Sequence, residues 1–135
     1  MRVSGKIWKR VAVAALVVVV GTVGVATPAN ASSRETFADI VCKDYGFGVH
    51  EIKYKGWGVE YPASTEIHVD RIVLLNNEWW FTTENEMWTT GTGSWSTPTG
   101  TKDASLMSGT FKLIVWVYRV SDETLLGTDS DQCTI

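Results

Sequence analysis

The sequence contains few of the residues from which metal sites and nucleophilic active sites are usually built. It has two cysteines, Cys42 and Cys133, and two histidines, His50 and His68. Two cysteines cannot complete a zinc site alone, and neither histidine lies at metal-ligand spacing from them. No G-x-S-x-G sequence or comparable nucleophile context accompanies the histidines, although a catalytic triad needs one. We therefore expect no catalytic residue, no metal and no cofactor.

Basic residues are also scarce once the N-terminal segment is set aside. The chain has 12 Lys+Arg and 15 Asp+Glu, and four of the basic residues but none of the acidic ones lie in residues 1–31. Residues 32–135 therefore carry 12 − 4 = 8 basic residues and a formal charge of 8 − 15 = −7. Such an acidic surface repels phosphate backbones and anionic lipid headgroups. We expect neither nucleic acid nor a membrane as a partner of this part of the chain.

Residues 1–31 have the pattern of a secretory signal peptide. Basic residues precede a fifteen-residue apolar run over 11–25, and Ala29-Asn30-Ala31 fits cleavage after Ala31. The run is shorter than the roughly 18–20 residues that a membrane-spanning helix needs, and no cysteine follows it that could carry a lipid anchor. The alternative is a retained N-terminal anchor. We predict a signal peptide over 1–31, a secreted protein, and one domain over 32–135.

Short β-branched and aromatic runs separated by turn residues dominate residues 32–135, without a sustained 3.6-residue apolar period. This pattern predicts an all-β fold, a small immunoglobulin-like or fibronectin-like β-sandwich of six to eight strands. In an exported protein Cys42 and Cys133 predict one disulfide. The pair Asn76-Asn77 predicts a hairpin turn. We predict a long polar loop over residues 84–102 and a single helical turn over residues 103–108. The predicted strands cover 37–43, 49–54, 57–61, 65–75, 78–83, 110–120 and 125–135.

Several acidic groups and one histidine are candidates for site chemistry. The sequence His68-Val69-Asp70 places an imidazole and a carboxylate on one strand face, which we interpret as a solvent-facing pair rather than a catalytic one. Glu84 and Glu86 could form a glycosidase pair, but so small a sandwich rarely offers the cleft. The acidic pairs of 122–123 and 129–131 lack the order of an EF-hand loop, and we interpret them as solvated turn carboxylates rather than calcium ligands.

Tryptophan is the strongest compositional signal, since six of the seven lie in residues 32–135. We assign Trp116 and one of the adjacent pair Trp79 and Trp80 to the core. Trp57 could belong to either class, and Trp88 and Trp95 are binding candidates, because exposed aromatic rings on a rigid β scaffold often bind sugars or proteins. The alternative is that the loop folds back and its rings cap an open edge of the sandwich. The candidate binding residues are Trp57, Trp88, Trp95, Glu84 and Glu86.

Two functional hypotheses from different classes remain open. The first is a protein-interaction module, an adaptor or inhibitor within a larger extracellular assembly, whose partners are other secreted proteins. The second is a carbohydrate-binding module that stacks Trp88, Trp95 and Trp57 on the rings of a glycan. An enzyme that depends on His68 is the remaining alternative.

The layout of the chain resembles the small adaptor subunits of secreted bacterial umbrella toxin particles. A secretory leader, a mature length of 135 − 31 = 104 residues, the Cys42/Cys133 frame and the tryptophan-rich strand pattern carry this resemblance. No specific motif contributes to it. In that family the adaptor links a large repeat-containing toxin chain to lectin-bearing subunits. The resemblance implies that residues 32–35 and a sheet edge contact partner chains.

Overall fold

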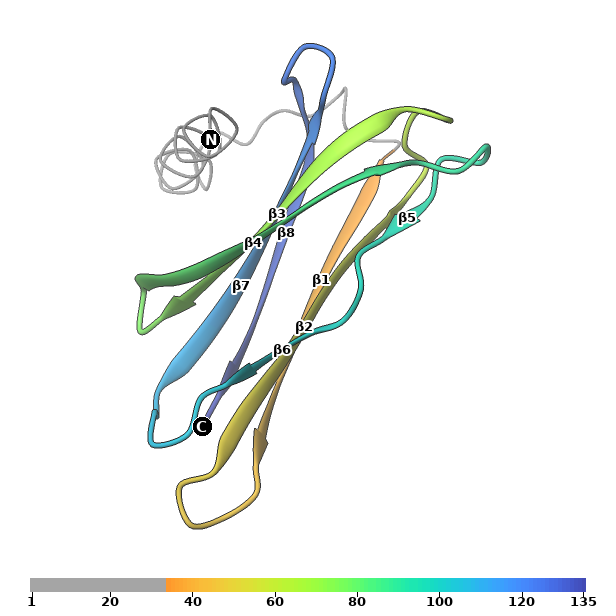
Figure 1. Cartoon of the computed structure of the whole chain (residues 1–135). Coiled ribbons are helices and arrows are strands. Elements are labelled where there is room, and N and C mark those ends of the chain that lie inside the picture. The colour runs from red at the N-terminus through yellow and green to blue at the C-terminus, as the bar shows by residue number, and fades with distance from the viewer. Residues whose placement is uncertain (1–33) are drawn as a thin grey trace. The chain divides into compact units, whose positions relative to one another are not determined.

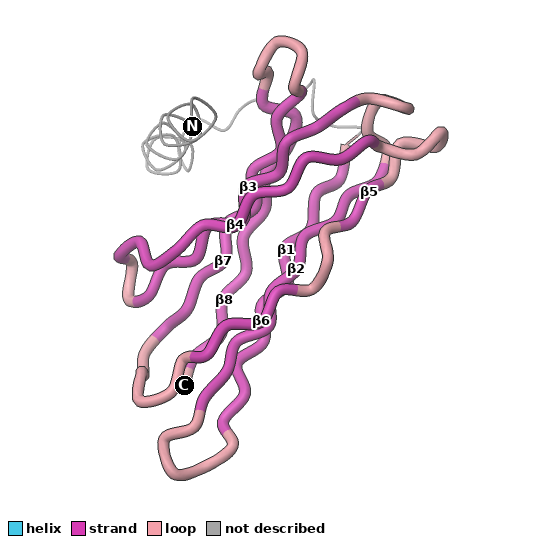
Figure 2. Tube along the Cα trace, in the orientation of Figure 1, coloured by secondary structure: helices cyan, strands magenta, loops and turns pink. Residues whose placement is uncertain are grey.

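The computed structural model describes residues 34–135, which fold into eight strands arranged as two packed antiparallel sheets (Figures 1 and 2). The all-β sandwich predicted from the sequence is confirmed, and its strand number lies within the predicted range. The predicted signal peptide and its cleavage site lie outside the described residues. The strands are β1 (Glu35–Asp44), β2 (His50–Val59), β3 (Glu66–Leu75), β4 (Glu78–Trp88), β5 (Trp95–Ser96), β6 (Gly100–Asp103), β7 (Thr110–Arg119) and β8 (Leu125–Thr134).

The two sheets differ in the way they are completed. In sheet A, β1 pairs with one edge of β2, and the short strands β5 and β6 pair with different parts of its other edge. In sheet B the order is β4-β3-β7-β8, so β3 and β7 are central strands. Residues 34–135 contain no helix that is long and apolar enough to cross a membrane.

The core lies between the sheets and is built mainly on the inward-facing residues of β3 and β7. Because side chains alternate along a strand, Val69 and Val73 face sheet A and lie opposite Val117 and Leu113 in the β3–β7 register. They pack with Ile52 and other buried residues of sheet A. Both central strands are also buried on their second face.

The β3–β4 hairpin follows the prediction closely. Asn76 and Asn77 both have positive φ, 52° and 69°, as a tight two-residue hairpin turn requires. The register then shifts between Val73 and Leu74, so that Trp80 has no cross-strand partner. As predicted, one of the two adjacent tryptophans packs against the core, and it is Trp80. Trp79 is 50% exposed.

The prediction of a polar loop over 84–102 was wrong. Strand β4 continues to Trp88, and β5 and β6 add further backbone pairing to β2. These pairings join residues distant in sequence, which local composition does not reveal. The predicted helical turn at 103–108 is also absent, because the described chain there makes a turn in which Met107 N–H donates to Ala104 O at 3.0 Å.

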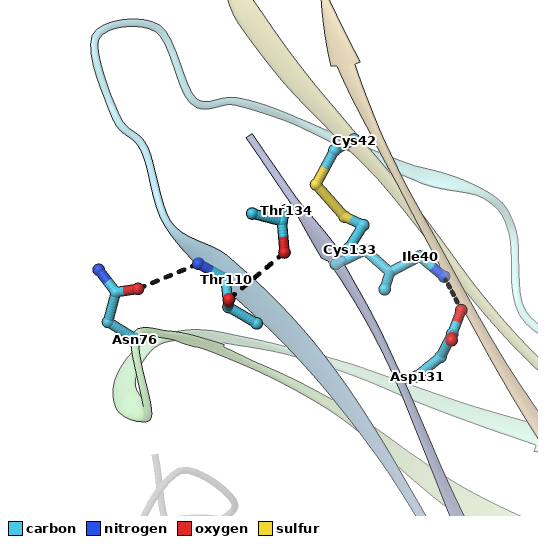
Figure 3. Close-up of a disulfide and its surroundings, with 7 residues drawn as sticks. All are labelled: Ile40, Cys42, Asn76, Thr110, Asp131, Cys133 and Thr134. Carbon is cyan, nitrogen blue, oxygen red and sulfur yellow. Dashed lines mark hydrogen bonds between the residues drawn. A yellow bond between two sulfur atoms is a disulfide. The ribbon is translucent and has the colours of Figure 1, made fainter.

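A side-chain seam joins β1 of sheet A to β8 of sheet B. The predicted disulfide is confirmed: Cys42 is bonded to Cys133 across a sequence separation of 91 (Figure 3). The carboxylates of Asp129 and Asp131, at alternate positions before Cys133, accept the backbone N–H groups of Ala38 and Ile40 at 2.8 and 3.0 Å. The interpretation of these aspartates as solvated turn carboxylates was therefore wrong, since both lie on a strand and bind backbone.

Candidate functional site

The outer face of sheet B, the face turned away from sheet A, carries the most unusual set of side chains in the described structure. The cross-strand register places Glu84 beside Asp70, Glu86 beside His68, and Trp88 beside Glu66. On the other side of β3, Trp116 lies beside Asp70, and Tyr118 beside His68. Five titratable groups, one imidazole and four carboxylates, therefore occupy neighbouring positions on β3 and β4. Aromatic residues of β7 flank His68 and Asp70.

The ring of His68 connects two of the carboxylates. Its Nε2 lies 2.8 Å from Asp70 Oδ1, and its Nδ1 lies 3.2 Å from Glu86 Oε2. Single donor atoms of His68, Asp70 and Glu84 all lie within 4.8 Å of one another. The second carboxylate oxygen of Asp70 is buried and has no hydrogen-bond partner. The cluster thus combines an oriented imidazole with an acceptor that is not satisfied.

The prediction that His68 and Asp70 face solvent was wrong, because in the full-length chain they are only 2% and 0% exposed. Their strand is central in sheet B, so each has a cross-strand neighbour on both sides rather than an open edge. A buried histidine between two carboxylates is held in one orientation. That property is common to structural, metal-binding and catalytic histidines.

Apolar and aromatic side chains surround this cluster on the same face. Trp116 and Tyr118 lie with ring centroids 6.4 Å apart and planes 13° apart. Trp116 was assigned to the core, and it is buried, but it lies on the outer face rather than between the sheets. Its indole nitrogen has no hydrogen-bond partner. At the end of β4, Trp88 is 64% exposed.

A second concave site lies on the outer face of sheet A. It is a hollow of about 510 Å³ lined by residues of β1, β2 and the segment around β5. Trp57 is the aromatic wall: its ring stacks on Phe37 with centroids 5.4 Å apart, and Lys55 Nζ lies 5.8 Å from its centroid. Asp39, the cross-strand neighbour of Lys55, adds a carboxylate. The hydroxyl groups in the lining belong to Thr90, Ser94 and Ser96.

Trp95 forms part of the same hollow but is only 5% exposed. Its ring meets that of Tyr61 edge-on, with centroids 5.6 Å apart and planes at 87°. Burial raises the pKa of Tyr61 to about 12, so its hydroxyl is neutral at physiological pH. Trp95 is therefore a packed residue behind the hollow, which agrees with the alternative that its segment folds back onto the sandwich and not with an exposed binding ring.

The five predicted binding residues therefore do not form one site. Trp57 and Trp95 line the hollow on sheet A, whereas Glu84, Glu86 and Trp88 lie on β4 of sheet B. The sequence did not single out Asp39 and Lys55 as lining residues, because nothing in their local pattern shows that β1 and β2 pair. The alternation Glu84-x-Glu86-x-Trp88 was the available signal that 84–88 is a strand rather than a loop.

Comparison with known proteins gives a likeness of fold. No protein-family model and no curated protein matches the sequence. A Bacteroides uniformis β-glucuronidase 2, solved with a covalently bound cyclophellitol-6-carboxylate aziridine, matches with a TM-score of 0.62 at 6% identity. A calcium-binding mutant of the same enzyme matches with a TM-score of 0.60 at 6% identity, and a further B. uniformis β-glucuronidase structure with 0.57 at 8%.

Each of these matches covers 73% of this chain but only 13% of the glucuronidase chain. The chain therefore spans a small part of the length of these enzymes, and at such low identity the likeness shows the β-sandwich fold alone.

Proposed function

We propose that the protein is a secreted, non-enzymatic protein-interaction module, an adaptor subunit of a larger extracellular assembly. The observation that carries this proposal is the composition of the outer face of sheet B. An antiparallel sheet that faces water alternates apolar and polar residues, but the outward positions of β3 and β7 include Ile72, Ile114 and Trp116. Within residues 34–135 no strand covers this face.

The chemistry of the face favours a protein partner that offers both basic and apolar groups. Trp88, which is 64% exposed at the end of β4, gives this face an accessible aromatic residue, and tryptophan is a common anchor in protein-interaction sites. Glu84 and Glu86 are exposed on the same strand as Trp88 and would repel an acidic partner. The predicted net charge of −7 for residues 32–135 acts in the same direction over longer distances.

An adaptor needs two separate contact surfaces, and the sandwich offers two. The apolar face of sheet B and the hollow on sheet A lie on opposite sides of the core. This arrangement, together with the predicted leader over 1–31, supports the resemblance to the adaptor subunits of umbrella toxin particles. The resemblance also implies a contact through residues 32–35; of these, Glu35 belongs to β1, and Arg34 Nε donates to Leu126 O at 3.1 Å.

The test is co-purification of the chain and its variants from the culture supernatant of the producing cells. We expect stoichiometric secreted partners, and the partner bound at the outer face of sheet B should be lost when Trp88→Ala is combined with Glu86→Lys on β4. The variant Trp57→Ala, on the opposite face, is the matched control and should retain the same partner. The proposal would be overturned if the protein purified as a monomer without other chains. It would also be overturned if the β4 variant recovered the same partners as the wild type.

A carbohydrate-binding module is the second candidate, and the hollow beside Trp57 is the observation that favours it. An aromatic wall next to a carboxylate, an ammonium group and hydroxyl groups is a suitable arrangement for stacking and hydrogen bonding to a sugar. A panel of soluble and insoluble glycans should then quench tryptophan fluorescence in the wild type and in Trp88→Ala, but not in Trp57→Ala. No response across the panel would exclude this candidate.

A further inference from the structure

The cluster on the outer face of sheet B has the donor geometry of a metal site. His68 and Asp70 are two residues apart on β3, so their side chains share a face, and Glu86 and Glu84 are their cross-strand neighbours on β4. Directly opposed residues of an antiparallel pair have Cβ atoms about 5 Å apart. The four groups therefore converge through regular strand pairing, and donor atoms of His68, Asp70 and Glu84 lie within 4.8 Å of one another.

Asp70 supplies an independent sign that a ligand is missing from this cluster. It is completely buried, and its Oδ2 has no hydrogen-bond partner. A buried carboxylate oxygen that is not satisfied is costly, since it has given up its hydration without a replacement. A cation beside Asp70 would compensate for that loss directly.

His68 is already oriented as a metal ligand would be. Metal-binding histidines commonly bond their second ring nitrogen to a carboxylate, which fixes the ring and increases the basicity of the ligating nitrogen. Here Nδ1 lies 3.2 Å from Glu86 Oε2, and Nε2 points to Asp70 Oδ1 at 2.8 Å. A metal ion bound by Nε2 and the Asp70 carboxylate would replace this contact.

We propose that His68, Asp70 and Glu84 bind a divalent transition metal of the zinc class, with Glu86 as the residue that orients His68. One imidazole nitrogen and two carboxylate oxygens are a ligand set that Zn²⁺ accepts, and three protein ligands leave a fourth position open. Ca²⁺ is disfavoured because it takes six to eight oxygen ligands. This inference goes beyond the proposed function, because metal binding is measured on the chain alone and can succeed or fail without any partner.

The test is calorimetric titration of Zn²⁺ into the chain that begins at residue 32, after removal of metal with a chelator. The eight strands, the core cluster and the disulfide of the described part of the chain form one compact unit over residues 34–135, so this chain should fold without residues 1–31. We expect one Zn²⁺ per chain. Glu84→Gln should weaken binding by at least tenfold, and Glu86→Gln by about 10- to 100-fold, as losses of orienting partners usually do.

Two matched variants control for the chemistry of the changed residues. His50 is the other histidine of the chain, and Glu78 is an exposed acid at the start of the same strand as Glu84. His50→Gln and Glu78→Gln should bind Zn²⁺ with unchanged affinity, whereas His68→Gln should not bind it. Because Glu84 is exposed, Glu84→Gln should keep the fold even if changes at the buried His68 disturb it.

A spectroscopic readout tests the ligands themselves. Added Zn²⁺ should move the Nε2 resonance of His68 and leave both nitrogens of His50 unchanged in nitrogen-15 spectra. Absence of Zn²⁺ binding at millimolar concentration would overturn the proposal. Binding that Glu84→Gln leaves intact, or a shift confined to His50, would overturn it equally.

Discussion

Among single residues, the aspartates of β8 have the clearest structural role. Asp129 and Asp131 accept the N–H groups of Ala38 and Ile40, which point away from β2 at the free edge of β1. Figure 3 shows the contact between Asp131 and Ile40. Unpaired edge groups invite pairing with another chain, and inward charges are one way in which sheet proteins prevent it. The two carboxylates therefore both join the sheets and protect the edge.

The first prediction concerns this edge. Asp131→Ala removes the acceptor of the Ile40 N–H group and leaves that donor partly buried, so the free energy of unfolding should fall by about 1–3 kcal/mol. Asp131→Asn retains an acceptor oxygen and should cost less. Ser130→Ala, at the exposed neighbouring position of β8, should stay within about 0.5 kcal/mol of the wild type. Chemical denaturation measures all three, and an Asp131→Ala variant as stable as Ser130→Ala would contradict this role.

The same residues show what local sequence could not convey. The alternation of Asp129, Asp131 and Cys133 is visible in the chain, but their partners lie about ninety positions earlier. The two cysteines could be paired because there were only two. The backbone partners of the two aspartates could not be predicted, since nothing in the local sequence distinguishes a carboxylate that binds backbone from one that binds water.

Strand β3 is the element that connects the two sheets through a polar side chain. Arg71 faces inward among core residues, and its guanidinium donates to Pro98 O at 2.7 Å, Tyr54 O at 3.3 Å and Asn85 Oδ1 at 3.0 Å. It also lies 4.9 Å from the centroid of the Tyr54 ring. Burial lowers the pKa of Arg71. The side chain thereby attaches the segment between β5 and β6 to sheet B.

The second prediction tests this attachment. Arg71→Met keeps an unbranched apolar stem but leaves Pro98 O and Asn85 Oδ1 without their donor. We expect the free energy of unfolding to fall by about 1–3 kcal/mol, with a larger local effect near Pro98. The Thr97 amide, which donates to Gly56 O at 2.9 Å, should exchange with solvent about tenfold faster or more, because local opening requires less free energy.

The Tyr61 amide provides the internal control for this exchange measurement. It donates to Gly93 O at 3.0 Å, outside the contacts of Arg71. In Arg71→Met its exchange rate should increase only by the factor that corresponds to the loss in the free energy of global unfolding. Equal acceleration of the Thr97 and Tyr61 amides would mean that Arg71 stabilises the whole fold without holding the β5–β6 segment.

Prediction at the scale of elements succeeded where the signal was local. The strands expected at 65–75 and 110–120 are β3 and β7 to within a residue or so, because long apolar runs bounded by turns identify them. The segment 84–102 failed because β5 and β6 are short, polar and defined by pairing with β2. For the same reason, the sequence did not show that the predicted binding residues lie on two different faces. It also did not show that His68, Asp70 and Glu84 converge, because they come together only when β3 and β4 pair.

At the scale of the whole molecule, the sandwich keeps its two candidate surfaces apart. Sheet A presents the hollow beside Trp57, and sheet B presents the aromatic face with its histidine and carboxylates. Mutations on one outer face should therefore leave the other intact, since distant sites with no shared contacts behave additively. The glycan proposal can consequently be separated from the partner and metal proposals by paired variants on the two faces, provided that the scaffold between the surfaces stays fixed.

The third prediction concerns that scaffold and its disulfide. Cys42–Cys133 closes a loop over a sequence separation of 91. In the loop-entropy description, loss of such a link should lower the free energy of unfolding by up to about 4–5 kcal/mol, mainly because the unfolded chain gains freedom. The Cys42→Ser, Cys133→Ser double variant should unfold at lower denaturant concentration. Its dependence on denaturant should also be steeper, because a chain without the link exposes more surface on unfolding.

The origin of this effect can be tested with a reducing agent. Reduction should shift the wild-type unfolding curve onto that of the double variant and should leave the double variant unchanged. The folded spectra should agree in all samples, since the bonds from Asp129 and Asp131 still join β1 to β8 without the disulfide. Loss of folded structure in the double variant before denaturant is added would show that the seam depends on the covalent link. Equal midpoints would instead show that the noncovalent contacts of the seam suffice.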